Sequence, residues 1–227
     1  RIDTSAYTPI DSVKPDRNGT FCLAFQPGMP GLYLIQLQDK TLAPVVVCPG
    51  DSIEATIREG DVSLTGGKEA GTFDQFRQSL ILDEEKVDSL GSVVLIARDL
   101  DIYPQIKVSA DSSWALLMQH ARERGISWIK TNPGFLSQIL VINSKIQQTF
   151  LFDQITDSSW FYTTDSQLMA AHRSNQHVQA FHNRIGLLRE ANRLEALARE
   201  NMKPGKKAPE ISLPGMNGKV IPFDPSK

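Results

Sequence analysis

The stretch Ala208-Pro-Glu-Ile-Ser-Leu-Pro-Gly-Met-Asn-Gly-Lys-Val-Ile-Pro-Phe223 decides how this chain is divided into folding units. An apolar run, a glycine-containing turn at residues 215–218 and a second short run predict a β-hairpin. A hairpin alone is barely stable in water, and few residues come after this one to pack against it. We therefore expect residues 204–227 to be a linker and the first hairpin of a further domain, whose body lies outside this sequence.

The segment before this hairpin reads as a helix that runs into a linker. Lys203-Pro-Gly-Lys-Lys207 contains the residues that end helices, and residues 175–201 read as the longest helix of the chain. One apolar stripe of this helix consists of Val178, Phe181, Ile185 and Leu188, and the stripe then shifts to Leu187, Ala191, Leu194 and Ala198. Asn192 and Glu195 stand where a sustained heptad needs apolar residues, so a long coiled coil is not expected.

Residues 67–203 predict a helical region, because apolar residues recur at helical spacing. A first helix carries Phe73 and Phe76 and is expected to end at Gly91, and a second is expected to be capped by residues 111–112 and interrupted at Gly125. Asn132-Pro133 predicts the start of a third helix, which runs through residue 146. Residues 157–158 predict the cap of a fourth, and residues 93–97 and 102–108 read equally as helix or strand.

Residues 1–66 predict an antiparallel β module, because short alternating runs are separated by turns. The expected strands cover residues 7–13, 20–25, 32–37, 43–48, 52–57 and 61–65, and Asn18-Gly19 favours a tight hairpin. Strands this short suggest a small sandwich or an open barrel. The fold class expected is therefore α+β, a sandwich-like or barrel-like β module followed by a helical segment.

Composition excludes several classes of protein. The formal net charge of −2 offers no basic excess for nucleic acid, and no apolar run approaches the ~20 residues that span a bilayer. The two cysteines, Cys22 and Cys48, are far from Cys-x-x-Cys spacing. Two interpretations stay open for them: buried free thiols, or a disulfide between neighbouring strands in an oxidising compartment.

No residue is assigned a catalytic, cofactor-binding or metal-ligating role. The histidines His120, His172, His177 and His182 lack the spacing of three or four that places two zinc ligands on one helix face. Thr65-Gly66-Gly67-Lys68-Glu69 lacks the first glycine and the hydroxyl of a phosphate loop, and a turn between the β module and the first helix explains it better.

Three further patterns have ordinary structural interpretations. Residues 83–85 form an acidic run, which we expect on a solvated helix face. Asp99 and Asp101 lie close together in the sequence, but no partner acid or cation marks them as a functional site. The aromatic residues 160–162 are expected to pack in the core.

The chain resembles the region that precedes the thioredoxin-like domain in envelope thiol-disulfide oxidoreductases of the AhpC/TSA type. The motifs that carry this resemblance are Asn18-Gly-Thr-Phe21, Gly31-Leu-Tyr-Leu34, Val47-Cys-Pro-Gly-Asp-Ser-Ile53, Thr65-Gly-Gly67 with Glu69, Asn132-Pro133 and Ala208-Pro-Glu-Ile-Ser-Leu213. In that family a domain of unknown function comes first, and Cys-x-x-Cys comes after a hairpin like that of residues 208–223. Two departures are the missing initial strand pair and the missing Cys-x-x-Cys.

The resemblance implies a periplasmic or lipid-anchored protein that contains a thiol-disulfide reductase domain. This chain is then the accessory region that positions that domain, forms a homodimer or selects a protein partner. It carries no catalytic residue and no cofactor, so whether the chain is itself an enzyme is left open. The alternative is a free-standing β-sandwich module that binds a peptide or glycan.

Overall fold

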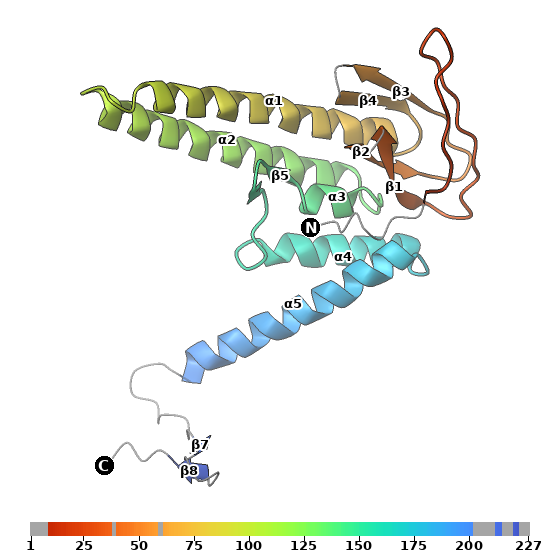
Figure 1. Ribbon diagram of the computed structural model, residues 1–227. Coiled ribbons are helices and arrows are strands. Elements are labelled where there is room, and N and C mark those ends of the chain that lie inside the picture. Colours follow the sequence, from red (N-terminus) through yellow and green to blue (C-terminus); the bar gives the residue numbers. More distant parts are fainter. Residues whose placement is uncertain (1–8, 38–39, 59–60, 202–211, 215–219, 223–227) are drawn as a thin grey trace.

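The computed structural model describes residues 9–37, 40–58, 61–201, 212–214 and 220–222 (Figure 1). Its elements are β1 (Gly31–Leu37), β2 (Lys40–Val47), β3 (Ile53–Arg58), β4 (Asp61–Gly66), α1 (Ala70–Ile96), α2 (Tyr103–Thr131), α3 (Gln138–Ile142), β5 (Lys145–Ile146), β6 (Thr149–Phe150), α4 (Ser158–His172), α5 (Gln176–Asn201), β7 (Ser212–Pro214) and β8 (Val220–Pro222). The expected combination of antiparallel strands followed by helices is confirmed.

The N-terminal strands form two antiparallel pairs, β1 with β2 and β3 with β4. Four of the predicted strands are confirmed, with boundaries that differ by at most a few residues. No closed sandwich or barrel is present among the described residues. The two hairpins share a small core of Ala43, Val45, Val62, Leu64 and Ala70, which joins β2, β4 and the start of α1.

Strand β2 is buried on both faces. Ala43 and Val45 point into the small core, while Val46 and the following Cys48 belong to the main helical core. Because successive side chains of a strand alternate between faces, a continuous apolar run suits a strand that lies between two layers. Strand β2 therefore ties the β module to the helices.

The first part of the described chain, residues 9–30, contains no strand. The strand predicted at residues 20–25 is therefore wrong, as is the strand predicted at residues 7–13 over the residues that the structure describes. The predicted turn is present: Asp16 Oδ1 accepts hydrogen bonds from the N–H groups of Asn18 and Thr20, both at 2.8 Å, and Gly19 has φ of +80°. Prolines at positions 9, 15 and 27 remove backbone donors, and a ladder of hydrogen bonds does not form along these flanks.

Helices α1 and α2 lie side by side as a long hairpin (Figure 1). Three expectations here are wrong. Gly91 lies inside α1, Gly125 lies inside α2, and Asp111 pairs with Lys107 (2.7 Å) in mid-helix instead of capping. Helix α2 begins instead at Tyr103 with a proline in its first turn, so it is longer than α5, which was expected to be the longest helix.

Asn132 ends a helix, which is the reverse of the expectation. Its Nδ2 donates to the Trp128 carbonyl oxygen at 2.9 Å, and Gly134 follows with φ of +76°. Helix α3 is only five residues long and leads into the β5–β6 hairpin. The long third helix predicted through residue 146 is therefore absent.

Helices α4 and α5 begin close to the predicted positions. Asp157 precedes α4, and Asn175 caps α5 by accepting the N–H groups of His177 and Val178 at 2.9 and 3.4 Å. Val178, Phe181 and Ile185 are buried as predicted, while the second stripe is exposed. Strands β7 and β8 pair as an antiparallel hairpin, which confirms the pairing expected within residues 208–223; the remainder of that stretch lies outside the described residues.

Candidate functional site

Two of the motifs singled out in the sequence, residues 47–53 and 65–69, meet where the β module joins the helices. Asp51 lies in the turn after β2, and its carboxylate accepts the Cys48 N–H (2.8 Å) and the Lys68 N–H (2.9 Å). One side chain thus fastens the turn after β2 to the turn before α1. We call Cys48, Asp51, Glu69 and Ser137, with the turn at residues 66–68, the joint.

The two glycines of the joint are required by backbone conformation. Gly66 and Gly67 have φ of +76° and +65°, a region that side-chain-bearing residues rarely adopt. A Cβ on Gly66 would lie 2.6 Å from the Ser52 carbonyl oxygen. The N–H of Gly67 donates to that same oxygen at 2.9 Å. Because the N–H groups of residues 67 and 68 are already bonded within the protein, the segment is a connecting turn, as expected, and not a phosphate cradle.

Glu69 is the centre of the joint. Its side chain is only 1% exposed, and its Oε2 accepts both the backbone N–H (2.9 Å) and the hydroxyl (2.8 Å) of Ser137. Glu69 stands directly before α1, where the free N–H groups of the first turn favour a negative charge. The residue therefore fixes the start of α1 to the start of α3.

Cys48 is buried beside this carboxylate, with its Sγ 4.0 Å from Glu69 Oε1. Burial, and then the charges of Glu69 and Asp51, raise the pKa of the Cys48 thiol to about 11. A thiol with so high a pKa is a poor nucleophile at neutral pH. Both cysteines are free, so the disulfide interpretation is wrong. Cys48 is buried as expected, whereas Cys22 is exposed.

The histidines do not form a metal site. No group of three or more His, Cys, Asp or Glu side chains suited to a metal ion occurs in the part of the chain that the structure describes. His120 is exposed, and His182 Nδ1 lies 2.8 Å from Asp165 Oδ1. His177 is half-buried, and this burial lowers its pKa. All four histidines are thus exposed or partly buried.

Buried carboxylates are the polar residues that sequence reasoning missed. Asp74, Asp83, Asp157 and Asp165 are each nearly buried and pair with Arg77, Arg124, Arg122 and Arg189, respectively. The expectation that residues 83–85 form a solvated face is therefore wrong for Asp83. Three of these pairs join residues 24 or more positions apart, so no local pattern predicts them. Each carboxylate is satisfied by a cation, which indicates a structural role.

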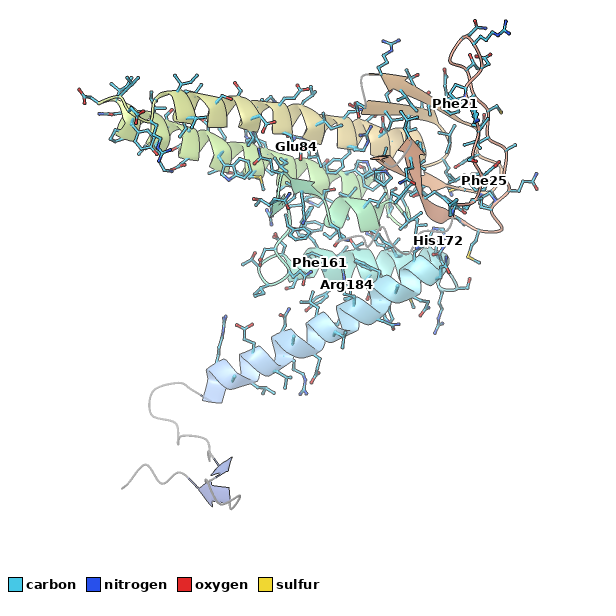
Figure 2. All side chains as sticks on the ribbon, in the orientation of Figure 1. Phe21, Phe25, Glu84, Phe161, His172 and Arg184 are labelled. Atoms are coloured by element: carbon cyan, nitrogen blue, oxygen red, sulfur yellow. The ribbon has the colours of Figure 1, made fainter. Side chains whose placement is uncertain are left out.

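A shallow groove of about 570 Å³ lies where residues 29–30 meet the α4–α5 connection. His172, labelled in Figure 2 at this end of α4, contacts the Gly134 carbonyl oxygen at 3.0 Å through Nε2. Asn175 Nδ2 donates to the Pro30 carbonyl oxygen at 2.6 Å. Two of the polar side chains that line this groove are therefore already engaged in contacts within the protein.

The aromatic residues of α4 pack as expected. Phe161, labelled in Figure 2, is buried, and Trp160 and Tyr162 are partly buried against the same core. The ring of Tyr162 lies 4.9 Å from the Arg189 guanidinium carbon.

Among the described residues, none of the helices combines the length and apolar content that crossing a bilayer requires. No protein-family model, curated protein or solved structure matches this chain.

Proposed function

We propose that this chain is the non-catalytic N-terminal region of a thiol-disulfide oxidoreductase, and that it positions a thioredoxin-like domain or selects its protein partner. The observation that carries the proposal is the shape of α5. Its N-terminal part packs on α4, with side-chain contacts as far as Asn192, and the remaining turns extend away from the helices (Figure 1). A 26-residue helix is about 39 Å long, a suitable length for a spacer.

The exposed second half of α5 supports a spacer that holds a domain at its end. Leu187, Leu194 and Leu197 are 75%, 54% and 47% exposed. Ion pairs within the helix, Glu190 with Arg193 and Glu195 with Arg199, stabilise it without neighbours. A helix built in this way holds its direction while its apolar side stays available for contact with another domain.

The chemistry of the cysteines supports a non-catalytic role. A reductase needs a thiolate of low pKa with a second cysteine nearby, whereas Cys48 is buried with a raised pKa. Cys22 is exposed and belongs to no Cys-x-x-Cys pair. Reduction of a partner's disulfide therefore falls to residues outside this sequence.

The proposal extends to the β module and to location. The two hairpins are taken as parts of an open antiparallel module of sandwich type, because their shared core already packs β2 against β4. The protein is proposed to be periplasmic, with a lipid anchor before residue 1. The periplasmic location and the lipid anchor rest on the family resemblance.

The experiment is an intact-mass measurement of the mature protein, followed by a disulfide-reduction assay. A mature protein that exceeds the 25.2 kDa of this chain by the mass of a domain of about 100–150 residues, with Cys-x-x-Cys in the added peptides, is expected. The 227-residue chain alone should not accelerate the reduction of insulin by dithiothreitol. A mature mass of 25.2 kDa, or catalysis by the chain alone, would contradict the proposal.

The spacer role has its own test in that mature protein. Deleting residues 194–200 removes about two turns, or about 10 Å, nearly preserves the helical phase and keeps Arg189, which pairs with the buried Asp165. Reduction of a small-molecule disulfide should be unchanged, and reduction of the protein partner should fall at least fivefold. Replacing Glu190 and Arg193 by alanine, which keeps the helix length, is the control and should leave both rates unchanged.

A further inference from the structure

The free end of the α1–α2 hairpin exposes aliphatic side chains in an unusual concentration. Within residues 93–102, five side chains are about half exposed or more: Val93 49%, Leu95 68%, Ile96 78%, Leu100 52% and Ile102 54%. We call these five residues the end patch. Exposed apolar side chains that gather in one place, rather than singly, are a feature of interaction sites.

The end patch is held on an ordered turn. The N–H groups of Ala97, Arg98, Leu100 and Tyr103 donate to the carbonyl oxygens of Val93, Leu95, Ala97 and Leu100, respectively, at 2.9–3.3 Å. Ala97, the residue directly after α1, is only 2% exposed. The side chains of the end patch are therefore presented in a fixed arrangement, which lowers the entropy lost on binding.

The rest of the protein does not cover this end. Ala97 is the one buried residue between positions 88 and 120 in the described chain, and the hairpin projects away from the other elements (Figure 1). Two helices without a further layer leave apolar surface in water, and such helices gain most of their stability from packing. The end patch thus lacks a partner within the described residues.

The charges at this end are suited to a second copy of the same surface. Arg98, Asp99 and Asp101 are exposed, and no ion pair joins any of them to another described residue. A symmetric interface brings a patch against itself, so it needs both signs of charge within that patch. Arg98 of one copy can face Asp99 or Asp101 of the other.

We propose that the end patch is a self-association surface through which two copies of this chain form a symmetric dimer. The inference goes beyond the proposed function, because it holds whether or not a thioredoxin-like domain follows. The two acidic residues oppose insertion into an anionic membrane, which leaves a protein surface as the better occupant.

The apolar area is consistent with a weak dimer. The exposed fractions of the five residues amount to roughly three whole aliphatic side chains, or about 180–360 Å² of apolar surface per copy. Since about 57% of an interface is apolar, this corresponds to about 320–630 Å² in total per copy, below the roughly 800 Å² of a standard interface. The expected dissociation constant is on the order of 10–100 μM.

The test is sedimentation equilibrium of the 227-residue chain from about 1 to 300 μM, a range that brackets this constant. The wild-type chain should dimerise, and Ile96→Glu should weaken the dimer at least tenfold. Leu82→Glu, at an exposed leucine of α1 that lies about 20 Å along the helix from Ile96, is the control and should leave the dimer unchanged. Circular dichroism should give the same helical content for all three chains.

Charge reversal makes the test specific to a symmetric pairing. Arg98→Glu makes the patch wholly acidic, and the double substitution of Asp99→Arg with Asp101→Arg makes it wholly basic. Each variant alone should be monomeric, and an equimolar mixture should recover a dimer. A wild-type chain that is monomeric up to about 300 μM, a dimer that Ile96→Glu does not weaken, or a mixture that stays monomeric would each overturn the proposal. Monomeric chain that binds neutral phosphatidylcholine vesicles through Ile96 would overturn it in favour of lipid.

Discussion

Replacement of Glu69 by alanine is expected to destabilise the whole protein, because Glu69 fixes the β module to two helices. The change leaves the Ser137 N–H and hydroxyl, both buried, without an acceptor. An orphaned buried polar group costs about 1–3 kcal/mol, so the two together amount to about 2–6 kcal/mol. With a urea m-value of about 2–3 kcal/mol/M, the midpoint of unfolding should fall by about 1–3 M.

A double-mutant cycle tests this reasoning further. Ser137→Ala removes the hydroxyl but keeps the backbone bond to the carboxylate, so it should cost about 1–2 kcal/mol. In the double variant, the hydroxyl that Glu69→Ala leaves without an acceptor is absent. The double variant should therefore be about 1 kcal/mol more stable than the sum of the two single effects predicts. Strict additivity would show that the two side chains do not interact.

The control for the loss of a glutamate charge is Glu85→Ala, at an exposed position within α1. Its effect on the free energy of unfolding should stay within about 0.5 kcal/mol of zero, as for most surface changes. Urea unfolding followed by circular dichroism measures all four variants. A Glu69→Ala variant as close to wild type as this control would refute the role assigned to the joint.

Other substitutions and pH changes should separate strained, neutral and titrating positions. Gly66→Ala combines a left-handed backbone with a Cβ 2.6 Å from the Ser52 carbonyl oxygen, so it should lower the midpoint of thermal unfolding. Gly91→Ala lies in open space within α1 and should raise the free energy of unfolding by about 0.5–1 kcal/mol. Equal effects of the two substitutions would contradict the argument about these glycines. Because folding raises the Cys48 pKa from 9.0 to about 11, the stability contributed by the protonated thiol is complete below pH 9 and is lost between pH 9 and 11. In urea titrations, the free energy of unfolding of Cys48→Ala should therefore fall less over this range than that of the wild type. Because burial lowers the His177 pKa below 6.5, stability should fall as the pH drops below 6.5 towards the folded pKa, and His177→Gln should reduce this slope; an unchanged slope would exclude His177 as its source.

The strands were predictable where the sequence sets both their apolar pattern and their ends. Residues 32–57 alternate or run apolar between turns that contain glycine, and the observed β1, β2 and β3 follow closely. The same pattern misled at residues 20–25, because a strand needs a neighbour to bond with. A neighbour is a property of the whole fold, and local alternation does not report it.

Helix ends were predicted poorly for a related reason. Gly91 and Gly125 cost helix propensity, but the packing of α1 against α2 outweighs that cost, and a Cβ at residue 125 would lie 3.0 Å from the Phe152 ring. Asn132 can cap either end of a helix, and only the chain direction of its neighbours decides which. The joint was predictable as a turn, yet the Glu69–Ser137 bond spans 68 positions and leaves no trace in the sequence.

The burial of β2 on both faces has a consequence for how the protein unfolds. If the β module separated from the helices, Val46 and Cys48 would lose the main core, and if the helices melted first, β2 would be left with one bare face. Neither layer can therefore be released at low cost while the other persists. We expect the amide protons of β2 and of the buried parts of α1 to exchange with solvent in a single cooperative event, so that the two layers behave as one foldon.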